Sequence, residues 1–160
     1  MKTSQFAAIG LCLACVSFPG FVAAQNQSID SDIQILRANI RADKVQVVSQ
    51  EMQLSDEEAK AFWPLYNKYE AELTKLNDER VALLKEYADK YDNLTNEQVQ
   101  SLAHRNFDLQ KRRVDLRADY FKKISRAISP KTAARFAQVE DRIDLLLNLQ
   151  LAASVPMVQK

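Results

Sequence analysis

The sequence predicts an all-α protein: four helices in an elongated antiparallel hairpin or cradle, with the second and third helices long. Three observations carry this prediction. Apolar residues recur at spacings of three and four, no stretch alternates with the two-residue period of a strand, and no glycine follows residue 20. Helix-starting motifs then divide the chain after residue 30 into four segments.

The first 24 residues have the features of a secretory signal peptide. Lys2 supplies a positive charge, and the apolar run over residues 6–18 is too short to cross a bilayer as a helix. We expect cleavage after Ala24, export to the periplasm, and one helical domain over residues 25–160 without stable membrane insertion. Acylation at Cys15 is the alternative form of processing.

The first predicted helix covers residues 31–51. Ser31 can cap its first turn, and its apolar stripe consists of Ile29, Ile33, Leu36, Ile40 and Val47.

The second predicted helix covers residues 56–91. Ser55 and Glu58 have the spacing of a capping box, in which each side chain binds the backbone amide of the other residue, and Leu54 can pack on the first turn. Pro64 lies inside the helix, where it cannot donate a backbone hydrogen bond, so we expect a kink. Arg80 is the exception in an apolar stripe made of Ala59, Phe62, Tyr66, Tyr69, Leu73, Leu76, Leu83 and Tyr87.

The third predicted helix covers residues 96–127. It starts with a second capping box, made by Thr95 and Gln98 and preceded by Leu94. It carries two apolar stripes about 140° apart around the axis. One stripe is Leu102, Leu109 and Leu116, and the other is Phe107, Val114, Phe121 and Ile128. The second stripe is either core within one chain or the seam of a two-fold dimer.

The fourth predicted helix starts at Pro130 and ends near Asn148. Ser129, preceded by Ile128, can cap it, and proline is favoured at a first helical position. Its inward residues are predicted to be Phe136, Val139, Ile143, Leu146 and Leu147. The apolar tail over residues 149–158 either docks on a partner subunit or is an exposed, sticky end of the chain.

Composition excludes several classes of function. The two cysteines lie within the first 15 residues, so the expected mature chain has no disulfide and no zinc–thiolate site. Without glycine it has no glycine-rich phosphate loop. His104 is the sole histidine, and Asp108 is the one carboxylate within a helical turn of it. We expect no enzymatic activity, no cofactor and no metal site.

Charge is unevenly distributed, although the expected mature chain has a net charge of zero. Residues 56–92 contain ten acidic and six basic residues, whereas residues 105–126 contain eight basic and three acidic residues. The third helix is therefore a basic rod with apolar stripes. Nucleic acid is not an expected partner for an exported chain without net charge.

The motif at residues 94–98, Leu-Thr-Asn-Glu-Gln, resembles the Leu-Thr-x-x-Gln helix starts of the Spy/CpxP family of periplasmic proteins. Residues 54–58 are a near match and residues 128–132 a degraded one. The resemblance covers roughly residues 30 to 148. It implies a helical dimer whose basic, apolar concave face binds unfolded proteins without ATP. Relatives in that family modulate an envelope sensor kinase or bind heavy metals.

Seven residues are the candidates for contact with a client or partner protein. Trp63 lies off the main stripe of the second helix, and the others follow the basic, apolar part of the third: Phe107, Arg112, Arg113, Val114, Arg117 and Phe121. The alternative for the basic residues is pairing with the acidic second helix. The expected function is that of an ATP-independent chaperone for unfolded or envelope proteins. The alternatives are an adaptor that docks on a stress sensor and a heavy-metal-binding protein.

Overall fold

The structure is a computed structural model that describes residues 43–159, apart from the side chains of Gln150 and Ser154. This range contains α2 (Asp56–Lys90), the short 3-10 helix η1 (Tyr91–Asn93), α3 (Asn96–Ala127) and α4 (Pro130–Ser154). Residues 43–52 are also helical, and no strand occurs within the described range. The all-α prediction, with long second and third helices, is confirmed. The predicted signal peptide, Cys15 and the stripe over residues 29–40 lie outside the described residues.

Both predicted capping boxes are present. The Ser55 hydroxyl accepts from the Glu58 amide at 3.3 Å, and the Glu58 carboxylate accepts from the Ser55 amide at 3.0 Å. The matching distances for Thr95 and Gln98 are 3.3 and 2.9 Å. These bonds satisfy amides that have no partner inside the helix, and they therefore set where α2 and α3 begin.

Helix α4 begins as predicted but runs further. The Ser129 hydroxyl accepts from the Thr132 amide at 3.0 Å, and Pro130 occupies the first helical position. The helix continues to Ser154, past the predicted end near Asn148. The added turns contain no helix breaker. Pro156 restricts the backbone of the residue before it, and Val155 is accordingly extended.

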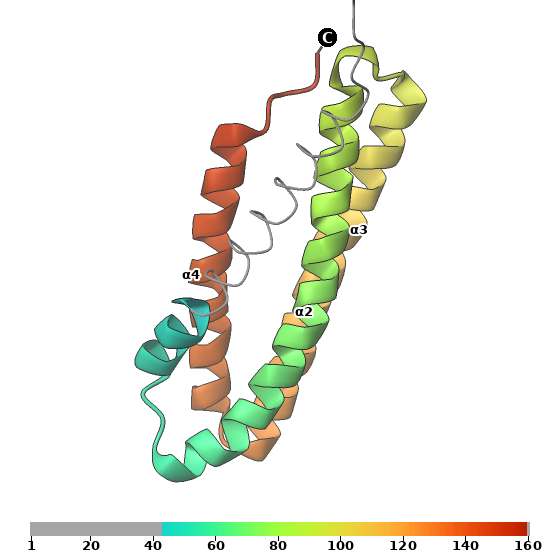
Figure 1. The fold of residues 1–160 in the computed structure, drawn as a ribbon. Coiled ribbons are helices and arrows are strands. Elements are labelled where there is room, and N and C mark those ends of the chain that lie inside the picture. The colour runs from blue at the N-terminus through green and yellow to red at the C-terminus, as the bar shows by residue number, and fades with distance from the viewer. Residues whose placement is uncertain (1–42, 160) are drawn as a thin grey trace, which may run out of the picture. The chain divides into compact units, whose positions relative to one another are not determined.

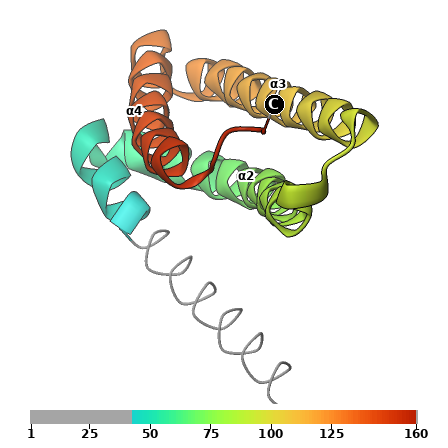
Figure 2. The same ribbon diagram turned by 90° about the horizontal axis from the view of Figure 1, so that it is seen from above.

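The helices α2 and α3 form an antiparallel hairpin, joined through η1 (Figure 1). Helix α4 returns from the end of α3 and packs against α3 (Figures 1 and 2). The first turns of α2 run at an angle to the rest of that helix in Figure 1, in agreement with the kink expected at Pro64.

One apolar cluster lies where the start of α2, the end of α3 and the start of α4 meet residues 48–52. Its aromatic rings pack at centroid distances between 5.1 and 6.3 Å, mostly edge to face. The cluster consists of Val48, Met52, Phe62, Tyr66, Tyr69, Leu73, Tyr120, Ile124, Ala133, Phe136 and Val139.

A second, smaller cluster lies along the hairpin alone. It consists of Leu76 and Leu83 from α2 and Leu102 and Leu109 from α3. Helix α4 contributes no residue to it. Apolar packing therefore joins α2, α3, α4 and the helical residues 43–52 at one end of this unit. Toward the other end, polar side chains link α4 to the hairpin.

Two residues predicted to face the core are exposed. Val47 is 41% exposed, because residues 43–52 turn Val48 and Met52 inward instead. Leu146 is 64% exposed. The inward face of α4 follows Phe136 and Ile143, and Leu146 is rotated by about 100° from Leu147, which continues that face.

The two apolar stripes of α3 differ in how far they are buried. Leu102 and Leu109 are buried in the hairpin, as predicted. The second stripe divides, because Phe121 and Ile128 pack against the larger cluster whereas Phe107 and Val114 are exposed. It is therefore core over only part of its length.

The apolar tail docks on its own chain through polar contacts. The hydroxyl groups of Tyr87 and Tyr91, at the end of the hairpin, donate to the carbonyls of Pro156 and Met157, each at 2.9 Å. The Met157 side chain is 87% exposed. Within the described residues, no helix has the length and apolar character needed to cross a membrane.

Candidate functional site

The most exposed aromatic side chain of α3 forms one half of an apolar patch on that helix. Phe107 is 64% exposed and Val114 is 55% exposed. They are seven residues apart, so they lie on one face, two turns from each other. We call this pair the α3 patch. Two large apolar side chains on one exposed helix face are a candidate surface for contact with another protein.

Arg112, on the same helix, is tied to α2. Its guanidinium donates to both carboxylate oxygens of Glu79, at 2.6 and 2.9 Å, and lies 3.6 Å from Asp108. These donated hydrogen bonds lower the pKa of the Glu79 carboxyl. The pair is the intramolecular contact with the acidic second helix that the sequence offered as the alternative. It is solvent-exposed, so it contributes little stability.

Arg113 and Arg117 instead reach α4. Arg113 donates to Asp144 of α4 and to Asn77 of α2, and Arg117 lies 2.9 Å from Asp141. These two arginines hold α4 beside the hairpin in the region where the apolar core does not extend. They are half-buried, and they are less available to another molecule than the sequence suggested.

Trp63 and Phe121 are packed against the larger cluster and are not free surface residues. The Trp63 ring lies edge-on to Phe62 at 5.4 Å and to Tyr66 at 5.6 Å. Trp63 is therefore only partly exposed, which leaves less of its ring for contact with another protein than the sequence suggested. Phe121 is likewise only partly exposed.

The other residues of the helix-start motifs pack or form hydrogen bonds within the chain. Leu54 and Leu94 are partly buried against the two clusters, and Ile128 packs against the larger one. Glu58 does more than cap α2, because its carboxylate also accepts from the Thr132 hydroxyl at 3.1 Å. The starts of α2 and α4 are thereby joined. The hydrogen bond that the Ser55 amide donates, followed by the one from the Thr132 hydroxyl, lowers the pKa of the Glu58 carboxyl.

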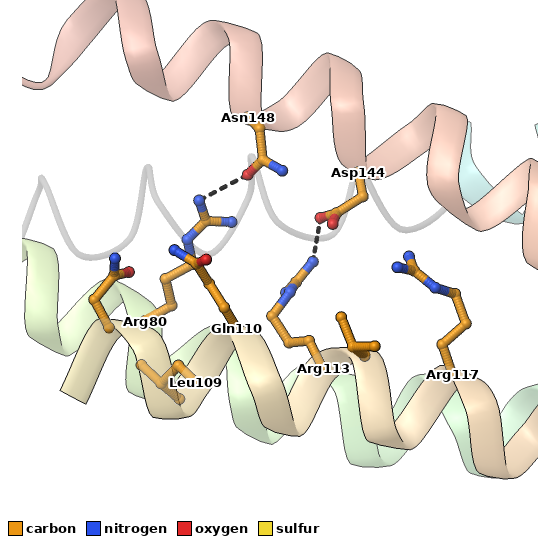
Figure 3. A pocket seen from close by; sticks show the side chains of 9 residues that line it. Arg80, Leu109, Gln110, Arg113, Arg117, Asp144 and Asn148 are labelled. Atoms are coloured by element: carbon orange, nitrogen blue, oxygen red, sulfur yellow. Dashed lines mark hydrogen bonds and ion pairs between the residues drawn. The ribbon is translucent and has the colours of Figure 1, made fainter. Parts of the chain in front are cut away.

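A pocket of about 240 Å³ lies between α2, α3 and α4. Three arginines line it, Arg80 from α2 and Arg113 and Arg117 from α3, and all extend toward α4 (Figure 3). Asp144 and Asn148 face them from α4. Sequence reasoning missed this pocket, although the signal was present: Arg80 interrupts the apolar stripe of α2.

A buried carboxylate was also missed. Glu140 on α4 is 3% exposed and accepts from the hydroxyl groups of Tyr66 at 3.2 Å and Tyr69 at 2.9 Å. Lys44 lies 2.8 Å from Glu140 and 2.6 Å from Glu70. Glu140 follows Phe136 by four residues and so occupies a core position of α4, which was the available signal.

No group of three or more His, Cys, Asp or Glu side chains within residues 43–159 is arranged to hold a metal ion. His104 is exposed on α3. Comparison with protein-family models, with curated proteins and with solved structures finds no match to this chain.

Proposed function

We propose that this protein is an ATP-independent periplasmic chaperone, or envelope-stress binding protein, that holds non-native proteins on α3. The observation that carries the proposal is the α3 patch, in which Phe107 and Val114 are 64% and 55% exposed on a helix rich in basic residues. A non-native protein exposes apolar side chains, and these can lose contact with water by covering the patch.

The arrangement of charge supports the same function. Lys111, between the two patch residues, is 73% exposed, and Arg105 is 51% exposed. Both pair with carboxylates of this chain, so the positive field comes from the excess of eight basic over three acidic residues along residues 105–126. Such a field accelerates the encounter with acidic segments and weakens with added salt. The patch then provides a contact that does not depend on sequence.

The test is the aggregation of a denatured client protein during refolding, followed by light scattering without nucleotide. The predicted mature chain, residues 25–160, should suppress aggregation at near-stoichiometric amounts, and salt should weaken the suppression. If several-fold excess gives no suppression, the chaperone proposal is wrong. Crosslinking to one saturable membrane partner would then favour the adaptor that docks on a sensor.

The homodimer remains part of the proposal. The exposed part of the second α3 stripe is a surface on which two chains could pair, and such pairing would compete with client binding. Sedimentation of wild type and of Phe107→Ser/Val114→Ser separates these uses. Equal dimer populations in the two proteins would place the dimer contact elsewhere.

A further inference from the structure

The pocket between α2, α3 and α4 contains an arginine without a carboxylate of its own. Arg80 donates to the side-chain oxygen of Asn148 at 2.7 Å and forms no ion pair within the part of the chain that the structure describes. Arg113 and Arg117, by contrast, are paired with Asp144 and Asp141. Asp144 also attracts Arg80 at longer range, but the three arginines outnumber the two aspartates, so the group keeps one net positive charge.

The position of Arg80 makes this charge costly for the fold. It lies between Leu76 and Leu83 on the inward face of α2, in the stripe that forms the smaller cluster. Its guanidinium is partly withdrawn from water and is close to that of Arg113, and both effects lower the pKa of Arg80. An apolar residue of similar length would meet neither cost. A residue that opposes the packing around it indicates a role outside the fold.

We propose that this pocket binds one carboxylate group carried on a short apolar chain, with Arg80 as its main partner. A guanidinium can donate two parallel hydrogen bonds to a carboxylate. The side chain of Gln110 also lines the pocket and adds a further polar group. Leu109 and Val114, which also line the pocket, offer apolar contact to the attached carbon chain.

The size of the pocket limits the ligand. A volume of about 240 Å³ is below the range of roughly 300–1,000 Å³ that is usual for drug-sized ligands. A short fatty acid or the terminal residue of a peptide would fit. Both present the same chemistry, a carboxylate on a few apolar carbons. The inference does not depend on the proposed chaperone function, because it concerns a single anionic group and not an unfolded chain.

The experiment follows the Arg80 side-chain Nε–H signal by NMR during titration of the purified protein at constant ionic strength. Butyrate is the probe and uncharged butyramide its matched control. We expect saturable shifts with butyrate, in the millimolar range, and none with butyramide. A peptide ending in leucine with a free carboxyl group, compared with its amidated form, distinguishes the two sources. Tighter binding of the free peptide than of butyrate would identify a chain end as the ligand.

Two variants separate binding from a structural role. Arg80→Met should weaken butyrate binding at least about tenfold, since it removes a charged hydrogen-bonding partner, and should leave the urea midpoint unchanged or raise it. Lys75→Met removes the same charge from an exposed position of α2 and should bind butyrate like wild type. Backbone amide shifts around Leu109 report binding in both variants.

Three results would overturn the proposal. The first is equal butyrate binding by Arg80→Met and Lys75→Met. The second is the absence of a saturable shift up to about 50 mM butyrate, which is weaker than any specific site of this kind. The third is a urea midpoint for Arg80→Met below that of wild type, which would show that Arg80 stabilises the fold through its hydrogen bond to Asn148. Tighter binding of inorganic phosphate than of butyrate would also contradict the assignment to carboxylates.

Discussion

At the scale of single residues, the buried carboxylate of Glu140 is the most demanding feature of the structure. A buried charge is tolerated only when it is paired and hydrogen-bonded. Two tyrosine hydroxyls and Lys44 meet that requirement from α2 and from the helical residues 43–52. Glu140 therefore fixes how three segments pack together, which an apolar side chain at that position would specify less sharply.

Removal of this carboxylate should destabilise the protein strongly. Glu140→Ala leaves Lys44 and two tyrosine hydroxyls short of a partner, and we expect a loss of about 3 kcal/mol in the free energy of unfolding. Urea denaturation measures it. Glu72→Ala is the matched control, because Glu72 also accepts from a buried tyrosine, Tyr120, but is exposed. Equal losses in the two variants would contradict the special role of Glu140.

The same contacts predict a loss of stability at alkaline pH. Burial, reinforced by the charge of Glu140, raises the pKa of both Tyr66 and Tyr69. The folded state therefore keeps protons that the unfolded chain releases above pH about 10. This contribution is fully present below pH about 10 and is lost above it, at up to about 1.4 kcal/mol per pH unit for each tyrosine.

Urea denaturation between pH 9 and about 11.5 checks this prediction. Wild type should lose stability with a steeper slope than Tyr66→Phe/Tyr69→Phe, which has no buried hydroxyl to ionise at these positions. Parallel slopes would show that other groups, such as lysines, cause the alkaline loss. The double variant should also be less stable at neutral pH, because Glu140 loses two donors.

At the scale of elements, helix starts were predictable because they depend on local chemistry. Ser55, Thr95 and Ser129 cap the helices that the sequence assigned to them. Helix ends were less certain. The added turns of α4 depended on the absence of a breaker before Pro156, and the docking of the tail on Tyr87 and Tyr91 is a tertiary contact that no local pattern shows.

The two capping boxes give a matched test of local against tertiary contributions. Ser55→Ala and Thr95→Ala should each cost about 1 kcal/mol, because each removes one amide's partner. Glu58→Ala should lower the melting temperature more than Gln98→Ala, since only the Glu58 carboxylate is shown to bond another helix, through Thr132. Equal shifts for Glu58→Ala and Gln98→Ala would mean that the bond to Thr132 contributes nothing.

At the scale of the whole described unit, the predicted all-α fold class was right. How far the apolar core extends between α4 and the hairpin was not evident from the sequence. Heptad spacing correctly placed Phe62, Tyr66 and Leu109 inside. It could not show that α4 leaves the hairpin's apolar seam, because this depends on where α4 crosses α3. The same geometry decides which basic residues of α3 are paired, and so the candidate site was predicted less well than the fold.

This uneven core predicts uneven protection from hydrogen exchange. Amides of α4 near Phe136 lie over the larger apolar cluster, whereas the described residues beyond Asn148 belong to neither apolar cluster. The second group should exchange faster, by local opening that does not unfold the protein. Mass spectrometry of peptides from the two halves of α4 measures this. Equal protection along α4 would contradict the division of the core.

The central claim is that the α3 patch, rather than exposed apolar surface in general, holds non-native proteins. The test compares the suppression of client aggregation by wild type with that by two double variants. Phe107→Ser/Val114→Ser changes the patch without touching the core. Leu145→Ser/Leu149→Ser removes apolar side chains from α4 that are 69% and 68% exposed. Circular dichroism confirms that each variant keeps its helix content.

We predict that the α3 variant loses most of its suppression and that the α4 variant keeps it, because the excess of basic residues lies on α3, over residues 105–126. Full suppression by Phe107→Ser/Val114→Ser, or equal loss in both variants, would contradict the claim.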